Sequence, residues 1–598
     1  LKHRPIVDAF HASTRTMHAS FVGQRPVPWP RRVPSQPCQQ KNQCCHARCQ
    51  QSTQAWTGTA TMAMGLVAPF VVCSRRAKRR AGTYCAQCTF ANGARYHVQL
   101  SAWRDMFEPA VDHPPQRVPA SWVSEGEWPS GLRGTLYRNG AGRMKVKDTK
   151  YGHWFDGDGY VVALSLSGSG DAVFGSRYVN TERFKAQERS KLGEGLEARG
   201  VWTQRRNGSW LSNVLRIPGN AANTSIAHFG GRLLALCEGG VPVQLNESTL
   251  ETIGEHRPEG WPFGLEGAFR VAGPFFSAHG KIDARTGRML NCGLSVAPTV
   301  SLHVFELHPK DGSVLKRISI PLDDLYFVHD FAVTHRHVVV VIAPWVCPAV
   351  NLATALLGIR SLGEGFEWQP ERGSRLIVLD RADLQVVHDT HVQALSFFHH
   401  INAWEDDDGM LRLHTLLHTE SREAVERGYS DILGTDLAAA RCLPWELVFD
   451  LGKGVLHSCE PLLPDSCLPG ELPAIHPKLV GAQHRYAYIN AASPSDAPIV
   501  NVLQRLDLKS ASVLTRSFGS HIWAGEPVVI PKPNRHEEDA IFVATWAYNE
   551  RRHGTDLILL DGERHLDIVC TLQLPFNIPP GFHGAWVPER QLAASAPS

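Results

Sequence analysis

The chain has 598 residues, enough for several domains, although all-β folds of this length often form one unit. Hydrophobic residues make up 43% and charged residues 20%, which is ordinary for a globular protein, and the net charge of +3 gives no reason to expect a nucleic-acid partner. No stretch approaches the roughly 20 apolar residues that span a bilayer, which excludes an integral membrane protein built from helices.

Residues 1–105 differ in composition from the rest of the chain. The first 100 residues contain one acidic residue against 14 Lys and Arg, many hydroxyl residues, and seven of the 14 cysteines. A basic, acid-poor and hydroxyl-rich stretch without periodicity is typical of an organelle transit segment. We therefore predict a disordered leader over 1–105, with Met62 or Met64 as alternative starts, and a single folded domain over 106–598.

From about residue 117, short apolar or alternating runs recur between Gly, Asp, Asn and Pro. Such runs over more than 450 residues predict an all-β sandwich or propeller, and the length favours a propeller with blades of about 40–50 residues. A Lys310-Asp311-Gly312 turn between two β-rich runs predicts a hairpin. The predicted strands lie in 134–140, 160–168, 232–240, 301–320, 337–344, 375–381, 411–418, 445–451, 486–492, 501–508, 540–548 and 556–562.

Helix signals are few, and the best are 351–362 and 421–428. The first lies in a long, mostly apolar insertion, 344–368, directly after a strong strand. Two interpretations stay open for this insertion: a loop helix packed on the propeller, or an exposed apolar patch that contacts a membrane surface.

The stretch Phe397–Gly409 (FFHHINAWEDDDG) combines two histidines with aromatic residues and ends in acids and glycine. Phe397 to Trp404 is predicted to be a buried strand, and Glu405–Gly409 the loop that follows. A histidine among aromatics is costly to bury unless its ring nitrogens are bound. It is therefore either a core histidine bonded to a backbone carbonyl or a ligand.

FFHHINAWE resembles the third histidine motif of the carotenoid cleavage oxygenase family. Three further stretches resemble the other histidine motifs of the family: FFSAHGKIDARTGRM with His279, YFVHDFAVTHRH with His329, and PPGFHGAW with His583. The words RNG (138–140) and HWFDGDG (153–159) resemble its N-terminal signature, and their glycines and aspartates are expected to shape turns. The resemblance covers about residues 117–590.

This resemblance implies a seven-bladed β-propeller with a few helices in loops that cap the metal face. It implies four metal ligands: His279, His329, His399 and His583. Their separations of 50, 70 and 184 residues match no local metal motif, but each blade can deliver one side chain to the axis. The resemblance selects His399 rather than His400, because the family's ligand stands three residues before the Asn that is Asn402 here. Adjacent strand residues also point to opposite faces, so only one of the two can face the metal.

Three glutamates stand where the family places carboxylates behind its ligand histidines: Glu238 in ALCEGGVP, Glu471 in GELPAIHP and Glu526 in WAGEPVVI. A metal-bound imidazole donates its other N–H to such a group, which fixes its tautomer. Four neutral imidazoles leave coordination positions open, which suits Fe(2+) better than zinc. Aromatics beside the ligands, Phe398, Trp404, Phe582 and Trp586, are candidates for a tunnel wall, with core packing as the alternative.

The implied activity is that of a non-haem Fe(2+) dioxygenase, which cleaves a conjugated C=C bond of a carotenoid or apocarotenoid with O2 into two carbonyl products. An alternative within the fold is cleavage of stilbene-type phenolics, which needs a Tyr and Lys pair such as Tyr137 and Lys185. Retinoid isomerohydrolysis and a non-catalytic binding propeller are further alternatives. The leader and the substrate class together favour the plastid, with the cytoplasm as second choice. The cleaved bond, the substrate and the oligomeric state cannot be predicted from the sequence.

Overall fold

The computed structural model describes residues 105–593 except 148, 190–199, 204–213, 215–217, 262–274, 297–298, 419–441, 464–465 and 493–499. All described residues belong to the second of two units of the chain, Phe90–Ser598. The predicted leader, apart from its last residue, and the predicted helix at 421–428 lie outside the described residues. Both stay predictions. None of the described helices is long and apolar enough to cross a membrane.

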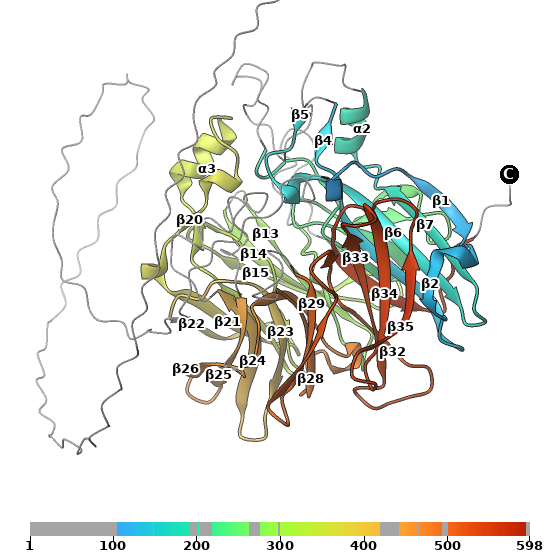
Figure 1. The fold of residues 1–598 in the computed structure, drawn as a ribbon. Coiled ribbons are helices and arrows are strands. Elements are labelled where there is room, and N and C mark those ends of the chain that lie inside the picture. Colours follow the sequence, from blue (N-terminus) through green and yellow to red (C-terminus); the bar gives the residue numbers. More distant parts are fainter. Residues whose placement is uncertain are drawn as a thin grey trace, which may run out of the picture. The chain divides into compact units, whose positions relative to one another are not determined.

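The described residues form seven antiparallel sheets of four to six strands, named here sheets 1 to 7 (Figure 1). Sheet 1 contains, in spatial order, β1 (His113–Arg117), β7 (Ala172–Tyr178), β6 (Asp158–Ser167), β3 (Arg133–Arg143) and β36 (Gly581–Pro588). Sheet 2 contains β11 (Thr252–Glu255), β10 (Val243–Leu245), β9 (Arg232–Leu236) and β8 (Ser225–Phe229). Sheet 3 contains β12 (Lys281–Ile282), β13 (Met289–Ser295), β14 (Ser301–Leu307) and β15 (Val314–Pro321).

The remaining four large sheets continue in chain order. Sheet 4 contains β17 (Ala332–Val333), β18 (His337–Ile342), β21 (Ser374–Asp380) and β22 (Val386–Val392). Sheet 5 contains β23 (Phe397–Glu405), β24 (Met410–His418), β25 (Cys442–Asp450) and β26 (Val455–Pro461). Sheet 6 contains β27 (Gly470–Ala474), β28 (Tyr486–Ala491), β29 (Val502–Asp507) and β30 (Ser512–Ser517). Sheet 7 contains β2 (Val123–Gly126), β35 (Asp567–Gln573), β34 (Gly554–Asp561), β33 (Ile541–Asn549) and β31 (Ile522–Ala524), with β32 (Val528–Pro531) also on β33.

Two smaller sheets lie in connections between these strands. One joins β16 (Leu325–Tyr326), β19 (Trp345–Cys347) and β20 (Glu367–Trp368), and the other joins β4 (Lys145–Val146) and β5 (Thr149–Lys150). The prediction of an all-β fold is confirmed, and each of the twelve predicted runs contains a strand. The predicted hairpin is confirmed too, because β14 pairs with β15 across the turn that contains Gly312.

Each sheet shares a hydrophobic cluster with the next sheet along the chain. Sheet 1 packs on sheet 2, and the series continues through sheet 7. A further hydrophobic cluster joins sheet 7 back to sheet 1. Two strand pairings that link the two ends of the chain support the same contact. The N-terminal β2 pairs with β35 in sheet 7, and the C-terminal β36 pairs with β3 in sheet 1. We infer that the seven sheets are the blades of a closed propeller, because this packing returns to its start.

The sequence of β18 shows why strands inside the sheets are apolar at every position. Val338, Val340 and Ile342 belong to the cluster between sheets 3 and 4. Val339 and Val341 point the other way, into the cluster between sheets 4 and 5. Successive strand residues face opposite sides, so a strand between two neighbouring sheets needs apolar residues at every position. The outer strand β15 alternates in exposure instead.

Two α-helices of eight residues lie on the same side of the sheets, α2 (Glu182–Arg189) and α3 (Ala349–Leu356) (Figure 1). The prediction of a helix at 351–362 is correct in type but wrong in its limits. The helix begins two residues earlier, directly after Pro348, whose φ of −58° and ψ of 152° lie outside the helical region. It ends earlier because Gly358 takes a φ of +75°, a left-handed conformation that terminates helices.

Candidate metal centre

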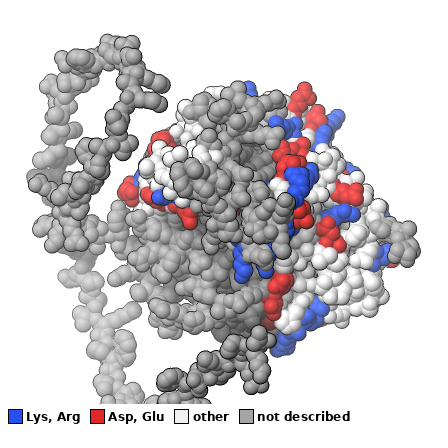
Figure 2. All heavy atoms as spheres, turned by 90° about the horizontal axis from the view of Figure 1, so that it is seen from above, with Lys and Arg blue, Asp and Glu red and all other residues white. Residues whose placement is uncertain are grey.

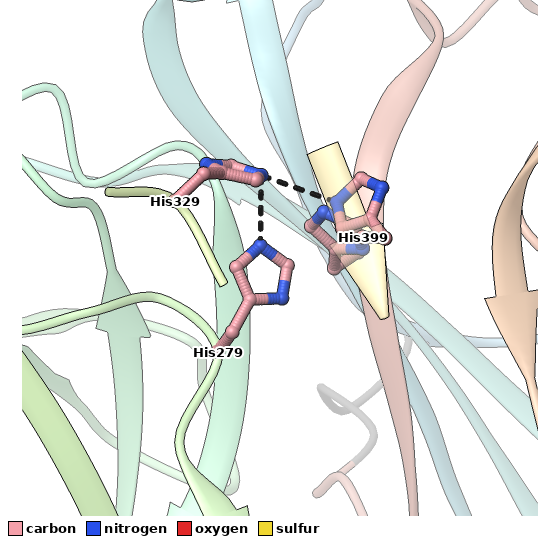
Figure 3. Close-up of side chains that lie close together, drawn as sticks. His279, His329 and His399 are labelled. Carbon is pink, nitrogen blue, oxygen red and sulfur yellow. Dashed lines mark hydrogen bonds between the residues drawn. The ribbon is translucent and has the colours of Figure 1, made fainter. Parts of the chain in front are cut away.

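The four predicted histidines meet where the large sheets come together. Their ligand atoms all lie within 4.8 Å of one another. The His279 and His329 Nε2 atoms are 3.0 Å apart, and the His329 and His399 Nε2 atoms are 3.1 Å apart. In Figure 3 the three labelled imidazoles converge from different segments. The structure therefore brings together four histidines, of which consecutive ones lie up to 184 positions apart in the sequence.

The three predicted glutamates lie behind three of these histidines. The His399 Nδ1 is 2.5 Å from the Glu471 Oε2, the His583 Nδ1 is 2.7 Å from the Glu526 Oε1, and the His329 Nδ1 is 2.8 Å from the Glu238 Oε1. Backbone groups orient two of the carboxylates, because the N–H groups of Leu472 and Gly584 donate to Glu471 and Glu526. Each glutamate is therefore placed to hold one imidazole in the tautomer with its proton on Nδ1.

Every large sheet contributes one of these seven residues. His279 and His329 stand just before β12 and β17, the first strands of sheets 3 and 4, and His399 and Glu471 stand in β23 and β27, the first strands of sheets 5 and 6. The other three come from sheets 2, 7 and 1: Glu238 just after β9, Glu526 between β31 and β32, and His583 in β36. Glu471 and His399 thus come from neighbouring sheets, as do Glu526 and His583, whereas Glu238 of sheet 2 reaches His329 of sheet 4.

The charges in the centre are coupled. Burial raises the pKa of the Glu238 and Glu471 carboxyls, but their contacts with His329 and His399 outweigh it, and both pKa values are lowered. Burial lowers the pKa of His279 well below its usual range, and the neighbouring histidines lower it further. His279 is consequently neutral at physiological pH, as a metal ligand must be.

The donor set fits a divalent metal ion. With the His329 and His399 Nδ1 atoms committed to carboxylates, the lone pairs of their Nε2 atoms face one another 3.1 Å apart and have no proton to share. A cation between them relieves this repulsion. Four imidazoles do not fill the coordination shell of an octahedral ion, so they leave positions open for further ligands.

His400 is placed differently from His399. Its Nδ1 lies 3.0 Å from the Thr415 Oγ1 in the next strand, and its ring packs on Phe397. The pairing of β23 with β24 shifts register on both sides of His400, so a β-bulge lies at the histidine pair. His399 reaches the cluster and His400 does not, although the role of His399 as a ligand stays a prediction.

A cavity of about 540 Å³ reaches the His329, His399 and His583 side chains from one side. Its wall contains an aromatic group formed by Phe155, Trp202, Phe327, Phe398 and Phe582. Phe155 contacts Phe398 and Phe582 at ring distances of 6.2 and 5.5 Å. Such a lining excludes water and accommodates a long apolar molecule.

Two of the four predicted wall aromatics line this cavity, Phe398 and Phe582. The other two, Trp404 and Trp586, do not line this cavity, and core packing was the alternative interpretation for both. Trp404 packs on His414 and His484, and Trp586 borders a separate cavity that His279 and His583 also line.

Arg138 and the segment 200–203 are site features that sequence analysis did not identify. Arg138 is buried, lines the cavity and donates to the carbonyl of Gly581, two residues from His583. Burial lowers its pKa to about 10, although Glu526 opposes the shift. The word RNG contains Arg138 and was a usable signal, whereas nothing in the residues around Trp202 pointed to a cavity wall.

The fold and site define a β-propeller with a four-histidine centre beside an apolar cavity. The sequence profile of the retinal pigment epithelial membrane protein (RPE65) family matches residues 107–588. Apocarotenoid-15,15'-oxygenase of a Synechocystis strain is 33% identical over 78% of this chain and 93% of its own length. The chloroplastic probable carotenoid cleavage dioxygenase 4 of Arabidopsis thaliana is 28% identical over 82% and 81%, respectively. Isoeugenol monooxygenase of Pseudomonas nitroreducens is 25% identical over 78% and 94%.

Solved structures of relatives are similar to this chain as well. Cobalt-substituted Synechocystis ACO superposes with a TM-score of 0.71 at 28% identity, over 82% of this chain and 99% of that one. The chain belongs to the RPE65 or carotenoid cleavage oxygenase family, and its fold is the β-propeller of that family. The predictions of the family, of the β-propeller and of an oxygenase are confirmed.

Proposed function

We propose that this protein is a non-haem Fe(2+) dioxygenase that cleaves one conjugated C=C bond of a carotenoid or apocarotenoid with O2. Two aldehyde or ketone products account for both oxygen atoms and for every carbon atom of the substrate. The observation that supports this proposal is the contact between the four-histidine cluster and the apolar cavity. A ferrous ion at the cluster supplies the activation of O2 that the reaction needs.

The residues around the centre have separate tasks in this proposal. His279, His329, His399 and His583 hold the ion through Nε2, and Glu238, Glu471 and Glu526 keep the Nδ1 protons in place. The aromatic wall excludes water and aligns a rigid polyene beside the cluster. No side chain has to transfer a proton, since both oxygen atoms come from O2 and no bond to hydrogen is broken.

A carotenoid-type substrate is favoured over a stilbene-type phenolic. Tyr137 is buried and its hydroxyl donates to the backbone of Glu247, and Lys185 is exposed on α2 beside Glu182. Neither residue lines the cavity, and its wall includes no lysine among the described residues. The polar pair suggested from the sequence is therefore not formed by these two residues. The isoeugenol monooxygenase relatives keep phenolic substrates as the second candidate.

The first test is a combined metal and activity measurement on the full chain. We expect about one Fe(2+) per chain and O2-dependent cleavage of β-carotene or of 8′-apocarotenals, with no cleavage of resveratrol or isoeugenol. Product lengths identify the bond. If iron binds and only the phenolics are cleaved, the substrate class is wrong. If no metal binds, the proposed centre is wrong.

We also propose that the apolar insertion 344–368 contacts a lipid surface from which the substrate enters. Leu352, Ala355 and Leu356 of this insertion line the cavity. Val350, Leu357 and Ile359 are 68%, 47% and 60% exposed. An exposed apolar patch at the entrance of an apolar cavity favours peripheral membrane contact. Figure 2 shows the molecule from above Figure 1, the side on which α3 lies. Among the described residues on this face, Lys and Arg lie close to Asp and Glu.

Charged substitutions in the patch are expected to weaken membrane binding. Val350→Asp together with Ile359→Asp should lower the fraction that floats with liposomes several-fold, because each change replaces exposed apolar surface with a hydrated charge. The matched control is Ile253→Asp, since Ile253 is 61% exposed in β11 and lies outside the insertion. Equal flotation of the patch variant and the control would contradict the proposal.

We further propose a plastid location, with the cytoplasm as second choice. The basic, acid-poor composition of residues 1–100 supports it. Several plant relatives are named chloroplastic, which is consistent with it.

A further inference from the structure

Asp330 is a buried carboxylate that directly follows His329 and makes its contacts with groups other than the four imidazoles. Its side chain is 2% exposed, and its Oδ1 lies 2.7 Å from the Lys281 Nζ. Its Oδ2 accepts the backbone N–H of His400 at 2.9 Å. Its Oδ1 also accepts the N–H of Phe331, its neighbour in the chain. Both carboxylate oxygens are therefore committed.

These contacts join three separate parts of the chain, each of which carries a histidine of the cluster. Lys281 stands two residues after His279, at the start of β12. Asp330 directly follows His329. The N–H that it accepts belongs to the residue after His399, at the β-bulge of β23. The three histidines labelled in Figure 3 are thus each one or two residues from a group that this carboxylate holds.

We propose that Asp330 is a positioning residue whose carboxylate ties together the three segments that carry the labelled histidines. This role rests on the proposed metal centre, and it is distinct from that of the three glutamates, which contact the imidazole rings. The glutamates orient single rings, whereas Asp330 fixes the distances between backbones. It does so because one buried charge accepts from a Lys ammonium and from two main-chain groups at once.

The charge balance of this site supports the assignment. The Lys281 ammonium lies 2.7 Å from the Asp330 Oδ1 and balances the charge of this buried carboxylate. The Lys281 ammonium is partly exposed and lies over the ring of Phe331. The fourth segment is held by other means, because the His583 N–H donates to the Thr224 carbonyl and its ring contacts Glu526. Loss of Asp330 should therefore loosen three ligands and leave the fourth in place.

Asp330→Asn is the variant that tests the tether. It keeps the shape of the side chain but replaces one acceptor oxygen with an NH2 group that faces a donor. We expect its affinity for Co(2+), titrated into the metal-free full chain and followed by visible absorption, to fall by about 10-fold or more. The ligand-field bands of the bound ion should also shift, since the distances between three ligands change. Lys281→Met together with Asp330→Asn removes the unpaired ammonium and should not restore the affinity.

The matched control is Asp561→Asn. Asp561 is also buried and forms a 2.7 Å ion pair with a lysine, Lys532, but it lies in β34, away from the ligand segments. It should lose stability without a change in Co(2+) affinity or spectrum. If Asp330→Asn is folded and matches the wild type in both, the tether is wrong.

Two lysine variants decide the question if Asp330→Asn does not fold. Lys281→Met should weaken Co(2+) binding, and Lys281→Arg, which keeps the charge, should bind nearly as the wild type does. Equal affinities in all three proteins would overturn the tether. The wild type is titrated alongside, so a wild type that binds neither Co(2+) nor Fe(2+) overturns the metal centre itself, and the tether with it.

Discussion

Replacement of His399 by alanine is expected to abolish metal binding and O2-dependent cleavage, whereas replacement of His400 should leave both in place. His399 presents its Nε2 to the cluster, and its Nδ1 is held by Glu471. Loss of a direct ligand should cost more than the roughly 10–100-fold in affinity that loss of an outer partner costs. Iron content and product formation per folded protein are the measurements.

His400→Ala is the matched control because it removes the same side chain one position along the same strand. It loses a buried contact with Thr415, so we expect a lower melting temperature with about one iron per chain retained. If His400→Ala loses the metal while His399→Ala keeps it, the ligand assignment is off by one. If both variants lose iron, the bulge in β23 and not a single ring controls the site.

The strand at Phe397 could be predicted because it depends on local pattern, whereas the choice of His399 over His400 came from the resemblance to the family motif. The strand was expected to end at Trp404 and ends at Glu405, where the acidic turn begins. The bulge could not be predicted, since nothing in FFHHINAW signals an extra residue. Alternation required only that the two rings face different partners, as they do; the family motif selected His399.

Convergence of the four histidines could not be predicted from spacing, and only the family resemblance pointed to it. The neighbours of each histidine are set by which strand begins each sheet, and this order is not visible in the sequence. Lys281 and Asp330 illustrate the limit. Both stand beside predicted ligands in the sequence, but 49 residues separate them, and only the ring of sheets places them 2.7 Å apart.

The cavity wall was the least predictable part of the site. Phe398 is next to His399 and was a natural candidate, whereas Trp202 and Leu352 come from connections with no ligand motif. The insertion 344–368 allowed two interpretations from its composition alone. Its helix α3 has both a buried side with Asn351 and Ala355 and exposed apolar residues, so packing on the propeller and membrane contact are compatible.

Replacement of Asp156 is expected to lower both the stability of the protein and its affinity for substrate. It lies in the word HWFDGDG, is 2% exposed, and its carboxylate accepts the N–H groups of Val201 and Trp202 at 2.7 and 3.0 Å. The Thr203 hydroxyl donates to it as well. This carboxylate therefore holds the segment 200–203, and with it Trp202, against the cavity.

Asp156→Ala leaves three donors without their acceptor. We expect the free energy of unfolding to fall by about 2–4 kcal/mol, measured by chemical denaturation. Asp156→Asn keeps the volume but turns one acceptor into a donor, so it should lose much of the same stability. The control is Asp171→Ala, because Asp171 is exposed in the turn between β6 and β7 and should change stability by less than about 0.5 kcal/mol.

The effect on substrate follows from what Trp202 touches. Its ring stacks on His153 at 4.7 Å and meets Phe155 at 5.4 Å, and the Val201 carbonyl accepts the N–H of Gly363 in the apolar insertion. Release of this segment should raise the KM for an apocarotenoid more than it lowers kcat, since the metal centre is untouched. An Asp156→Asn protein that is less stable but has an unchanged KM would show that the wall keeps its place without this carboxylate, and that the word HWFDGDG serves folding alone.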